Sequence, residues 1–437
     1  MQVGAVLVFE AGPLELRHGG IDIERFRAYT AARLGHTPRA QQRSVELALG
    51  RLPVWVDDPF FNLDYHVRHA ALPRPGDERQ LKRLAARIFS QALDREKPPW
   101  ELWLVEGLDA GRFAVIAKAD TAFASGRDGF DPLAALVRKS AEERIDAAPR
   151  AELRPTPGRI ALMRAELARR AREAARPEQI AAALGHGLRG ALNALERALA
   201  AAGELPLTGP AGPHRRVEWL ALEQADLRAV SERLAAPTHG VLLAALAGAL
   251  RVFASRRGLE PDALALRALT PIGVGAVPDE AIAPLVALPL AEPDPLLRLA
   301  ALRAAPAPTG ATGTRFSVLR DLANLQSAAA AGRPASLSVA SLSAPSAPLY
   351  LLGAPLRACI PIPSLLPGHT LGIAVSLFDE RAMLGFAGDA ALVPDLPLLV
   401  DAVAASFDEL RRLASRTVHP AKPRADHARG RKRGAEA

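Results

Sequence analysis

Short apolar runs alternate with amphipathic stretches along most of the chain, and this alternation predicts a mixed α/β protein. In the N-terminal part, apolar runs predict buried strands, and apolar residues at helical spacing predict helices. These predicted elements are Ala5 to Phe9, Ile23 to Leu34, Glu78 to Gln91, Glu101 to Val105, Arg112 to Ala117 and Pro132 to Val137. Asp22 is a suitable cap for the first helix, and the stretch from Leu52 to His69 is predicted to be a loop that leads into a strand.

The C-terminal part repeats the same alternation. Its predicted strands are Val217 to Leu222, Leu264 to Ile272, Leu285 to Pro289, Ser336 to Leu342, Leu349 to Leu352, Leu371 to Leu377 and Met383 to Ala387. Its predicted helices are Gln224 to Leu234, Val241 to Phe253, Asp294 to Leu302 and Asp395 to Leu413.

The stretch between the two parts differs in character. It contains several prolines and two alanine- and arginine-rich segments, 160–176 and 177–199, with few large apolar residues. We interpret it as a helical crossover without chemistry of its own. The predicted organisation is therefore a first domain over 1–140, a helical crossover over 141–212, a second domain over 213–416 and a tail over 417–437.

The turn after Lys118 is the part of the chain where chemistry is most expected. It follows the apolar run Phe113 to Ala117 and precedes a predicted helix, so it is a strand-to-helix turn, where many enzymes keep reacting groups. Its polar residues are Asp120, Thr121, Ser125 and Asp128, with neither histidine nor cysteine.

The cysteine count and the lengths of the apolar runs indicate which cellular compartment the protein occupies. The chain has one cysteine, Cys359, so an internal disulfide is excluded and a reducing compartment is favoured. There is no recognisable signal peptide, and no run approaches the roughly 18 uncharged apolar residues of a spanning helix. We therefore expect a cytoplasmic protein, with membrane contact limited to peripheral binding.

The formal net charge is +8, and the tail carries half of it, since residues 418–437 hold six Lys or Arg and two acids. Its composition predicts disorder. Two interpretations stay open: an electrostatic tether to an anionic surface, such as a membrane or lipid droplet, or a solubilising tail. Specific nucleic-acid binding is not expected, because aromatic and basic residues are not interleaved.

Asp64, His66 and His69 could suggest a metal site, but His66 and His69 would face opposite sides of a predicted strand. We expect local hydrogen bonds there and no metal centre. The sequence also lacks a nucleophile elbow and a phosphate-binding glycine loop.

A series of short motifs resembles the bacterial wax ester synthase/diacylglycerol acyltransferase family. The matching segments, in chain order, are Pro53–Pro59 (PVWVDDP), Asp64–Arg68 (DYHVR), Leu93–Arg95 (LDR), Pro99–Glu101 (PWE), Glu106–Leu108 (EGL), Ala247–Arg251 (AGALR), Pro348–Ala354 (PLYLLGA) and Val393–Asp395 (VPD). The resemblance implies two chloramphenicol-acetyltransferase-like α/β (α+β) domains with mixed sheets, joined by the helical crossover. It also implies acyl transfer from fatty acyl-CoA to a long-chain alcohol or diacylglycerol, with no permanently bound cofactor, and the loss of a short segment before Met1.

The resemblance also implies that the strand-to-helix turn is the family's catalytic motif in degenerate form. The family signature is His-His-x-x-x-Asp-Gly, in which the second histidine acts as general base on the acceptor hydroxyl. In a gap-free comparison the two histidine positions are Asp120 and Thr121, the aspartate position is Ser125, and Gly126 is retained. An alternative with a three-residue insertion places the Asp-Gly pair at Asp128 and Gly129. Both versions lack the histidines.

Other positions of the family pattern are altered as well. The Asn-Asp pair that opens the helix near Val241 is His239-Gly240, the strand ending at Pro271 to Gly275 lacks its arginine, and the Ser-Asn-x-Pro-Gly-Pro loop is Ala340 to Pro345 (ASLSAP). His239 could supply a base from the second domain, or could be an ordinary helix N-terminal residue.

Two hypotheses about function follow. One is an acyltransferase of this family that is inactive or strongly impaired, or slow with Asp120 or His239 as its base. The other is a non-catalytic relative that binds acyl-CoA or lipid, or regulates a partner enzyme.

Overall fold

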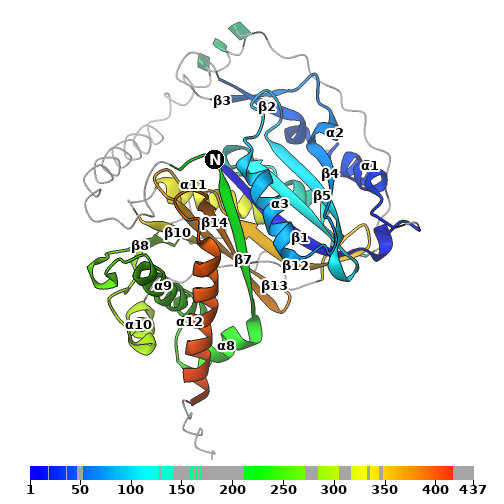
Figure 1. Cartoon of the computed structure of the whole chain (residues 1–437). Helices are drawn as coiled ribbons and strands as arrows, with labels where there is room; N and C mark the ends of the chain where they lie inside the picture. Colours follow the sequence, from blue (N-terminus) through cyan, green and yellow to red (C-terminus); the bar gives the residue numbers. More distant parts are fainter. Residues whose placement is uncertain are drawn as a thin grey trace, which may run out of the picture.

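The computed structural model describes residues 1–17, 19–35, 37–46, 53–126, 129–141, 145, 158, 160–161, 163–164, 167–168, 211–270, 284–304, 316–331, 335–343 and 348–416. Two six-stranded sheets, a small two-stranded sheet and the helices packed on them make up this part of the chain (Figure 1). The predicted helices at 160–176 and 177–199 and the basic tail lie almost entirely outside it.

The first sheet has the strand order β11-β12-β1-β6-β5-β4. Its strands are β1 (Gln2–Glu10), β4 (Val67–Ala71), β5 (Trp100–Leu108), β6 (Arg112–Asp120), β11 (Tyr350–Leu351) and β12 (Ala354–Ile362). β1 and β6 pair antiparallel over their full lengths, so that Gln2 lies opposite Asp120. This register places the start of the chain beside the turn that follows β6.

The second sheet has the order β7-β14-β13-β10-β8-β9. Its strands are β7 (Arg215–Glu223), β8 (Arg267–Leu269), β9 (Leu285–Ala287), β10 (Leu337–Ser343), β13 (Leu371–Phe378) and β14 (Arg381–Asp389). β10 runs parallel to both of its neighbours, while β13, β14 and β7 pair antiparallel. Mixed α/β architecture with mixed sheets, as predicted, is confirmed.

The helices are α1 (Ile23–Leu34), α2 (Leu63–His66), α3 (Glu78–Ser90), α4 (Thr121–Ala124), α5 (Pro132–Leu136), α8 (Gln224–Arg233), α9 (Thr238–Arg256), α10 (Pro295–Leu302), α11 (Val318–Ala331) and α12 (Leu396–Arg416). The predicted cap is confirmed, because the Asp22 carboxylate accepts the Arg25 N–H at 2.9 Å. α9 is long and apolar enough to cross a membrane, but 78% of its apolar window is buried inside the protein, as expected of a core helix.

The sheets do not follow the two halves of the sequence. β12, from the C-terminal half, pairs with β1 and so carries that half into the first sheet. α11 likewise packs against α4, β1 and α5 of the first half. Neither element was predicted: Pro355, Arg357 and Pro361 interrupt the apolar pattern of β12, and α11 follows the loosely patterned stretch from Pro306.

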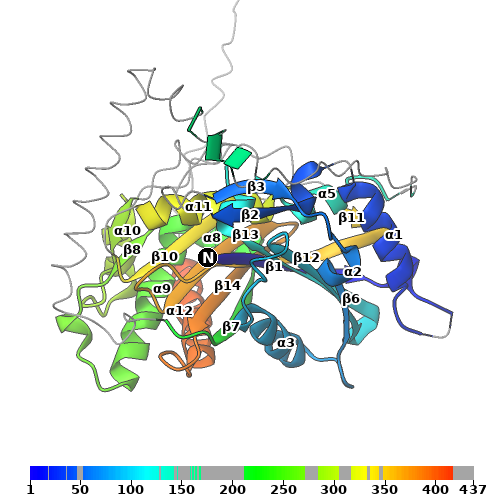
Figure 2. The ribbon, with the colours of Figure 1, turned by 90° about the horizontal axis from the view of Figure 1, so that it is seen from above.

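A shared apolar core joins the two sheets. The ribbon shows the two sheets side by side, with β12 next to β13 and β14 (Figure 2). α3 lies between the two sheets, with Leu81, Ala85 and Ile88 turned into this core, and packs on β7. The apolar face of this amphipathic helix therefore packs at the contact between the first and second sheets.

The stretch from Leu52 to His69 corrects the prediction of a loop. It contains β3 (Pro53–Asp57), which pairs with β2 (Gln42–Glu46), and then α2. His66 ends α2 instead of lying in a strand; it is buried, and its Nδ1 lies 2.8 Å from the Trp100 carbonyl oxygen. The partner of His66 is 34 residues away and that of His69 is Glu106, so these contacts are not the local hydrogen bonds that were predicted. The described residues contain no cluster of metal ligands. Of the strand predicted at Leu264 to Ile272, β8 covers only Arg267–Leu269. The last two residues of the prediction, 271 and 272, lie outside the described residues.

Candidate functional site

The turn after β6 is built around Asp120, the last residue of that strand. Its carboxylate caps α4 by accepting the Ala122 N–H at 2.9 Å, and it lies 3.2 Å from the Met1 amine. An Asp at a helix N-cap is a favoured arrangement because it satisfies an otherwise unpaired amide. The side chain is one-third exposed, and both of its oxygens have partners, one the Ala122 N–H and the other the Met1 amine.

Thr121, which the sequence comparison sets at the second histidine position, faces inward. It is 4% exposed, and its hydroxyl donates to the Met1 carbonyl oxygen at 3.1 Å. The Met1 carbonyl also accepts the Thr121 N–H at 2.8 Å. The side chain is therefore fixed in the packing between β1 and α4.

Ser125 and Gly126 close the turn. Ser125 is the C-cap of α4, and Gly126 adopts φ +86°, a left-handed conformation that favours glycine. The Gly126 N–H donates to Asn324 Oδ1 of α11 at 2.7 Å. At Gly129 a Cβ would lie 2.0 Å from the Ala124 carbonyl oxygen, so only glycine fits there. Asp128, the alternative motif aspartate, lies outside the described residues.

Asp131 holds two helices next to this turn. Its Oδ1 accepts the N–H groups of Leu133 and Ala134, at 2.9 and 3.2 Å, which begin α5. Its Oδ2 accepts those of Leu319 and Arg320, at 2.8 and 3.2 Å, which begin α11. Burial raises the pKa of this carboxyl group, and the four N–H donors oppose that effect.

Asp321, one turn into α11, is a second carboxylate in this region. Burial, reinforced by the charge of Asp131, raises its pKa to about 6. Because the folded-state pKa is above the value of about 3.9 in an unfolded chain, folding favours the protonated form. The stability from this group is present at acidic pH and is lost as pH rises through about 6.

We therefore expect Asp321→Asn to stabilise the protein at neutral pH, by about 1–3 kcal/mol, and to change little near pH 4. The free energy of unfolding in urea, measured at both pH values, checks this. An equal change at the two pH values would mean that the amide acts through packing and not through the charge.

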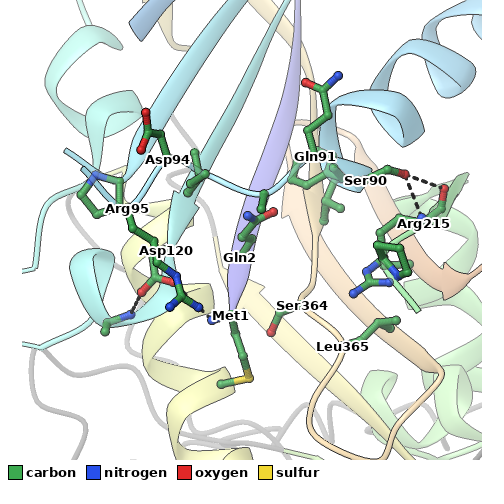
Figure 3. A pocket seen from close by; sticks show the side chains of 18 of the residues that line it. Met1, Gln2, Ser90, Gln91, Asp94, Arg95, Asp120, Arg215, Ser364 and Leu365 are labelled. Carbon is green, nitrogen blue, oxygen red and sulfur yellow. Dashed lines mark hydrogen bonds and ion pairs between the residues drawn. The ribbon is translucent and has the colours of Figure 1, made fainter. Parts of the chain in front are cut away.

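A cavity of about 560 Å³ opens beside the turn, between the two sheets (Figure 3). One wall consists of Met1, Gln2, Asp120 and the segment after α3, and the facing wall consists of β7, β14 and the residues that follow β12. Asp94 and Asp120 lie on one side, and Ser364 and Leu365 lie on the other (Figure 3). The β2–β3 hairpin contributes Trp55, so three parts of the chain converge on one space.

Lys118 positions the wall that follows α3. This lysine is fully buried, and its ammonium group donates to the carbonyl oxygens of Ile88 and Gln91, both at 3.0 Å. Burial lowers its pKa, and Glu101, 3.5 Å away, opposes that shift. The strand that carries Asp120 therefore also fixes the end of α3.

Cationic side chains lie on the same wall. Arg95, which is exposed, and Lys97, which is half-buried, both line the cavity. Arg215 lines the facing wall, where its N–H donates to Ser90 Oγ at 2.8 Å. The cavity wall therefore carries three cationic side chains and three carboxylates, those of Glu46, Asp94 and Asp120, together with apolar surface.

His239 lies apart from this cavity. It begins α9, it is 6% exposed, and its Nδ1 lies 3.5 Å from Ser341 Oγ of β10. Burial lowers its pKa to about 4, so the ring is neutral at neutral pH, and its Nε2 has no partner among the described residues. Of the residues predicted for the site, Asp120 lines the cavity, whereas Thr121, Ser125, Gly126 and His239 do not.

Two segments of the chain match domains of one known family. Residues 1–238 match the wax ester synthase/diacylglycerol acyltransferase catalytic domain, and residues 283–411 match the C-terminal domain of the same family. A putative diacylglycerol O-acyltransferase of Mycobacterium tuberculosis is 29% identical over 431 residues, covering 90% of this chain and 83% of that protein. A probable diacylglycerol O-acyltransferase of the same species is 39% identical over 127 residues, which span 29% of this chain and 45% of that relative.

Solved structures show the same fold. The wax ester synthase/diacylglycerol acyltransferase from Marinobacter aquaeolei superposes with a TM-score of 0.65 at 22% identity, covering 95% of both chains. The first condensation domain of the calcium-dependent antibiotic synthetase superposes with a TM-score of 0.54 at 16% identity, covering 95% of this chain and 91% of that domain.

Proposed function

The chain belongs to the wax ester synthase/diacylglycerol acyltransferase family, and from this membership we propose that it binds fatty acyl-CoA in the cavity beside Asp120 but transfers the acyl group poorly or not at all. The acceptor expected from the family is a long-chain alcohol or a diacylglycerol. In this proposal acyl-CoA is a substrate or ligand, and no permanent cofactor is required.

The observation that carries the proposal is the environment of Thr121. A general base must be able to take a proton near neutral pH and must reach the acceptor hydroxyl. The Thr121 hydroxyl cannot take a proton under these conditions, and it already donates to the Met1 carbonyl. Loss of a general base alone typically costs about 10²–10⁴-fold in rate.

Two substitute bases would make the protein a slow acyltransferase instead. Asp120 is favoured by its place on the cavity wall, although its two oxygens already contact the Ala122 N–H and the Met1 amine. His239 is less suitable, because burial lowers its pKa to about 4 and its side chain is not part of that wall. A carboxylate is a weaker base than an imidazole, so we expect little turnover through either group.

Binding of acyl-CoA is supported by the composition of the cavity. Arg95 and Lys97 at the edge suit the phosphates of coenzyme A, and Phe89, Val217 and Leu365 offer apolar surface to an acyl chain. Positioning without a base could still leave weak transfer.

A coenzyme A release assay with palmitoyl-CoA and either hexadecanol or a diacylglycerol tests the chemistry. We expect wild-type protein to release coenzyme A at the background rate, while fluorescence of Trp55 and the other tryptophans reports palmitoyl-CoA binding. Robust turnover that Asp120→Ala abolishes would replace the proposal with a carboxylate base, and robust turnover that His239→Ala abolishes would establish the histidine. Absence of palmitoyl-CoA binding would refute the proposal that the protein binds fatty acyl-CoA.

A further inference from the structure

A second cavity, of about 370 Å³, is lined by the first turns of α3, whereas the last residues of α3 line the cavity beside Asp120. The same strands contribute to both cavities. Val217 of β7 and Ile362 of β12 line the first cavity, and Trp219 and Ile360, two residues along the same strands, line the second. Since alternate residues of a strand face the same side of a sheet, the two cavities lie on one face of these sheets, under opposite ends of α3.

Phe89 lies where the first cavity ends along β1. It lines that cavity, although only 7% of the residue is exposed. Its ring lies directly over Gly4: a Cβ at Gly4 would be 2.1 Å from Phe89 Cζ, so the ring fills the place of the missing side chain. Gly4 lies on β1 between Gln2, which lines the first cavity, and Val8, which lines the second. The ring therefore marks the inner end of the first cavity.

The shared apolar core continues beyond this ring. Phe89 belongs to that core together with Val6 and Ala85. Val6 is the next residue of β1 after Gly4 that faces the same side, so the core extends from the ring toward the second cavity. Because protein interiors are close-packed, an alkyl chain that reaches the ring cannot advance without displacing it. The ring is thus a barrier at the apolar end of the first cavity.

We propose that Phe89 is a specificity-determining residue, which limits the length of the acyl chain that the first cavity accepts. The inference rests on the proposed function, because the chain in question is that of the acyl-CoA assigned to this cavity. Phe89 does not belong to the degenerate motif and has no part in proton transfer. The limit on chain length therefore holds whether or not acyl transfer survives.

The experiment measures the affinities of saturated acyl-CoAs from octanoyl-CoA to eicosanoyl-CoA by calorimetry, below the concentrations at which they form micelles. Each methylene group that becomes buried is worth about fourfold in affinity. We expect the affinity of wild-type protein to rise with chain length and to stop rising at the chain that reaches Phe89. In Phe89→Ala the affinity should rise further, by about 15-fold over that limiting chain, which corresponds to roughly two newly buried methylene groups. Phe89→Trp should move the limit to a shorter chain.

Phe253→Ala is the matched control, since Phe253 is a buried phenylalanine of α9 that lines neither of these two cavities. It should leave the limiting chain length unchanged. That length is the informative quantity, because a partial loss of folding would weaken the binding of every acyl-CoA alike. Phe89→Leu keeps an apolar side chain in the core and should give a smaller shift than Phe89→Ala, in the same direction.

The outcomes separate this inference from the proposed function. An affinity that rises through the whole series in wild-type protein would overturn the inference and leave the proposed function intact. The same holds for a limiting chain length that stays unchanged in both Phe89→Ala and Phe89→Leu. Failure of wild-type protein to bind any acyl-CoA would overturn both.

Discussion

Restoring the motif by Thr121→His together with Ser125→Asp is expected to raise acyl transfer from palmitoyl-CoA to hexadecanol or diacylglycerol by about 10²–10⁴-fold over wild type. The physical reason is that an imidazole titrates near neutral pH and can take the proton of the attacking hydroxyl. The aspartate is expected to hold the histidine and the turn in place. Coenzyme A release under saturating acyl-CoA measures the gain.

The structure sets one condition for this gain. Thr121 is buried and bonded to the Met1 carbonyl, so the larger ring must displace that contact and turn toward the cavity that Asp120 already lines. Thr121→Gln with Ser125→Asp is the size-matched control, because glutamine is similar in bulk but accepts no proton at neutral pH. It should stay at background.

The outcome separates two states of the site. Activity in the repaired variant alone would mean that the cavity still positions both substrates and only the base is missing. A silent repaired variant that still binds palmitoyl-CoA would mean that the cavity cannot place the thioester near residue 121. Activity in the glutamine control would contradict a general-base explanation altogether.

Local signals in the sequence were sufficient for most elements of the fold. Asp22 and Asp294 each precede a helical pattern and each cap the predicted helix, because capping depends on atoms only two or three residues away. β12 was missed for the opposite reason. Its prolines weaken the local pattern, and its stability comes from pairing with β1, more than 300 residues earlier in the chain.

The candidate site likewise contains one residue that the sequence could predict and others that it could not. Asp120 could be found from the motif, because the turn follows directly from the strand before it. Ser364 and Asp131 could not, since neither belongs to a recognisable pattern and their neighbours come from distant segments. Asp131 and Leu319, for example, are joined by a hydrogen bond across 188 residues. Only the packing of α11 beside the turn brings these groups together.

Replacing Asp131 by alanine is expected to cost about 3–5 kcal/mol in the free energy of unfolding. The substitution leaves four N–H groups without an acceptor, at the first turns of both α5 and α11, in a place that water does not reach. Each buried unpaired group costs about 1–3 kcal/mol, and relaxation of the two helix ends recovers part of the sum.

Asp294→Ala is the matched control for this prediction. Asp294 also caps a helix, accepting the N–H groups of Leu296 and Leu297 at 2.7 and 3.0 Å, but it is exposed and serves α10 alone. Water replaces its carboxylate, so the expected loss is about 1 kcal/mol. Urea unfolding of both variants at neutral pH gives the comparison. A loss in Asp131→Ala no larger than in Asp294→Ala would show that packing, and not the shared carboxylate, holds α11 against the turn.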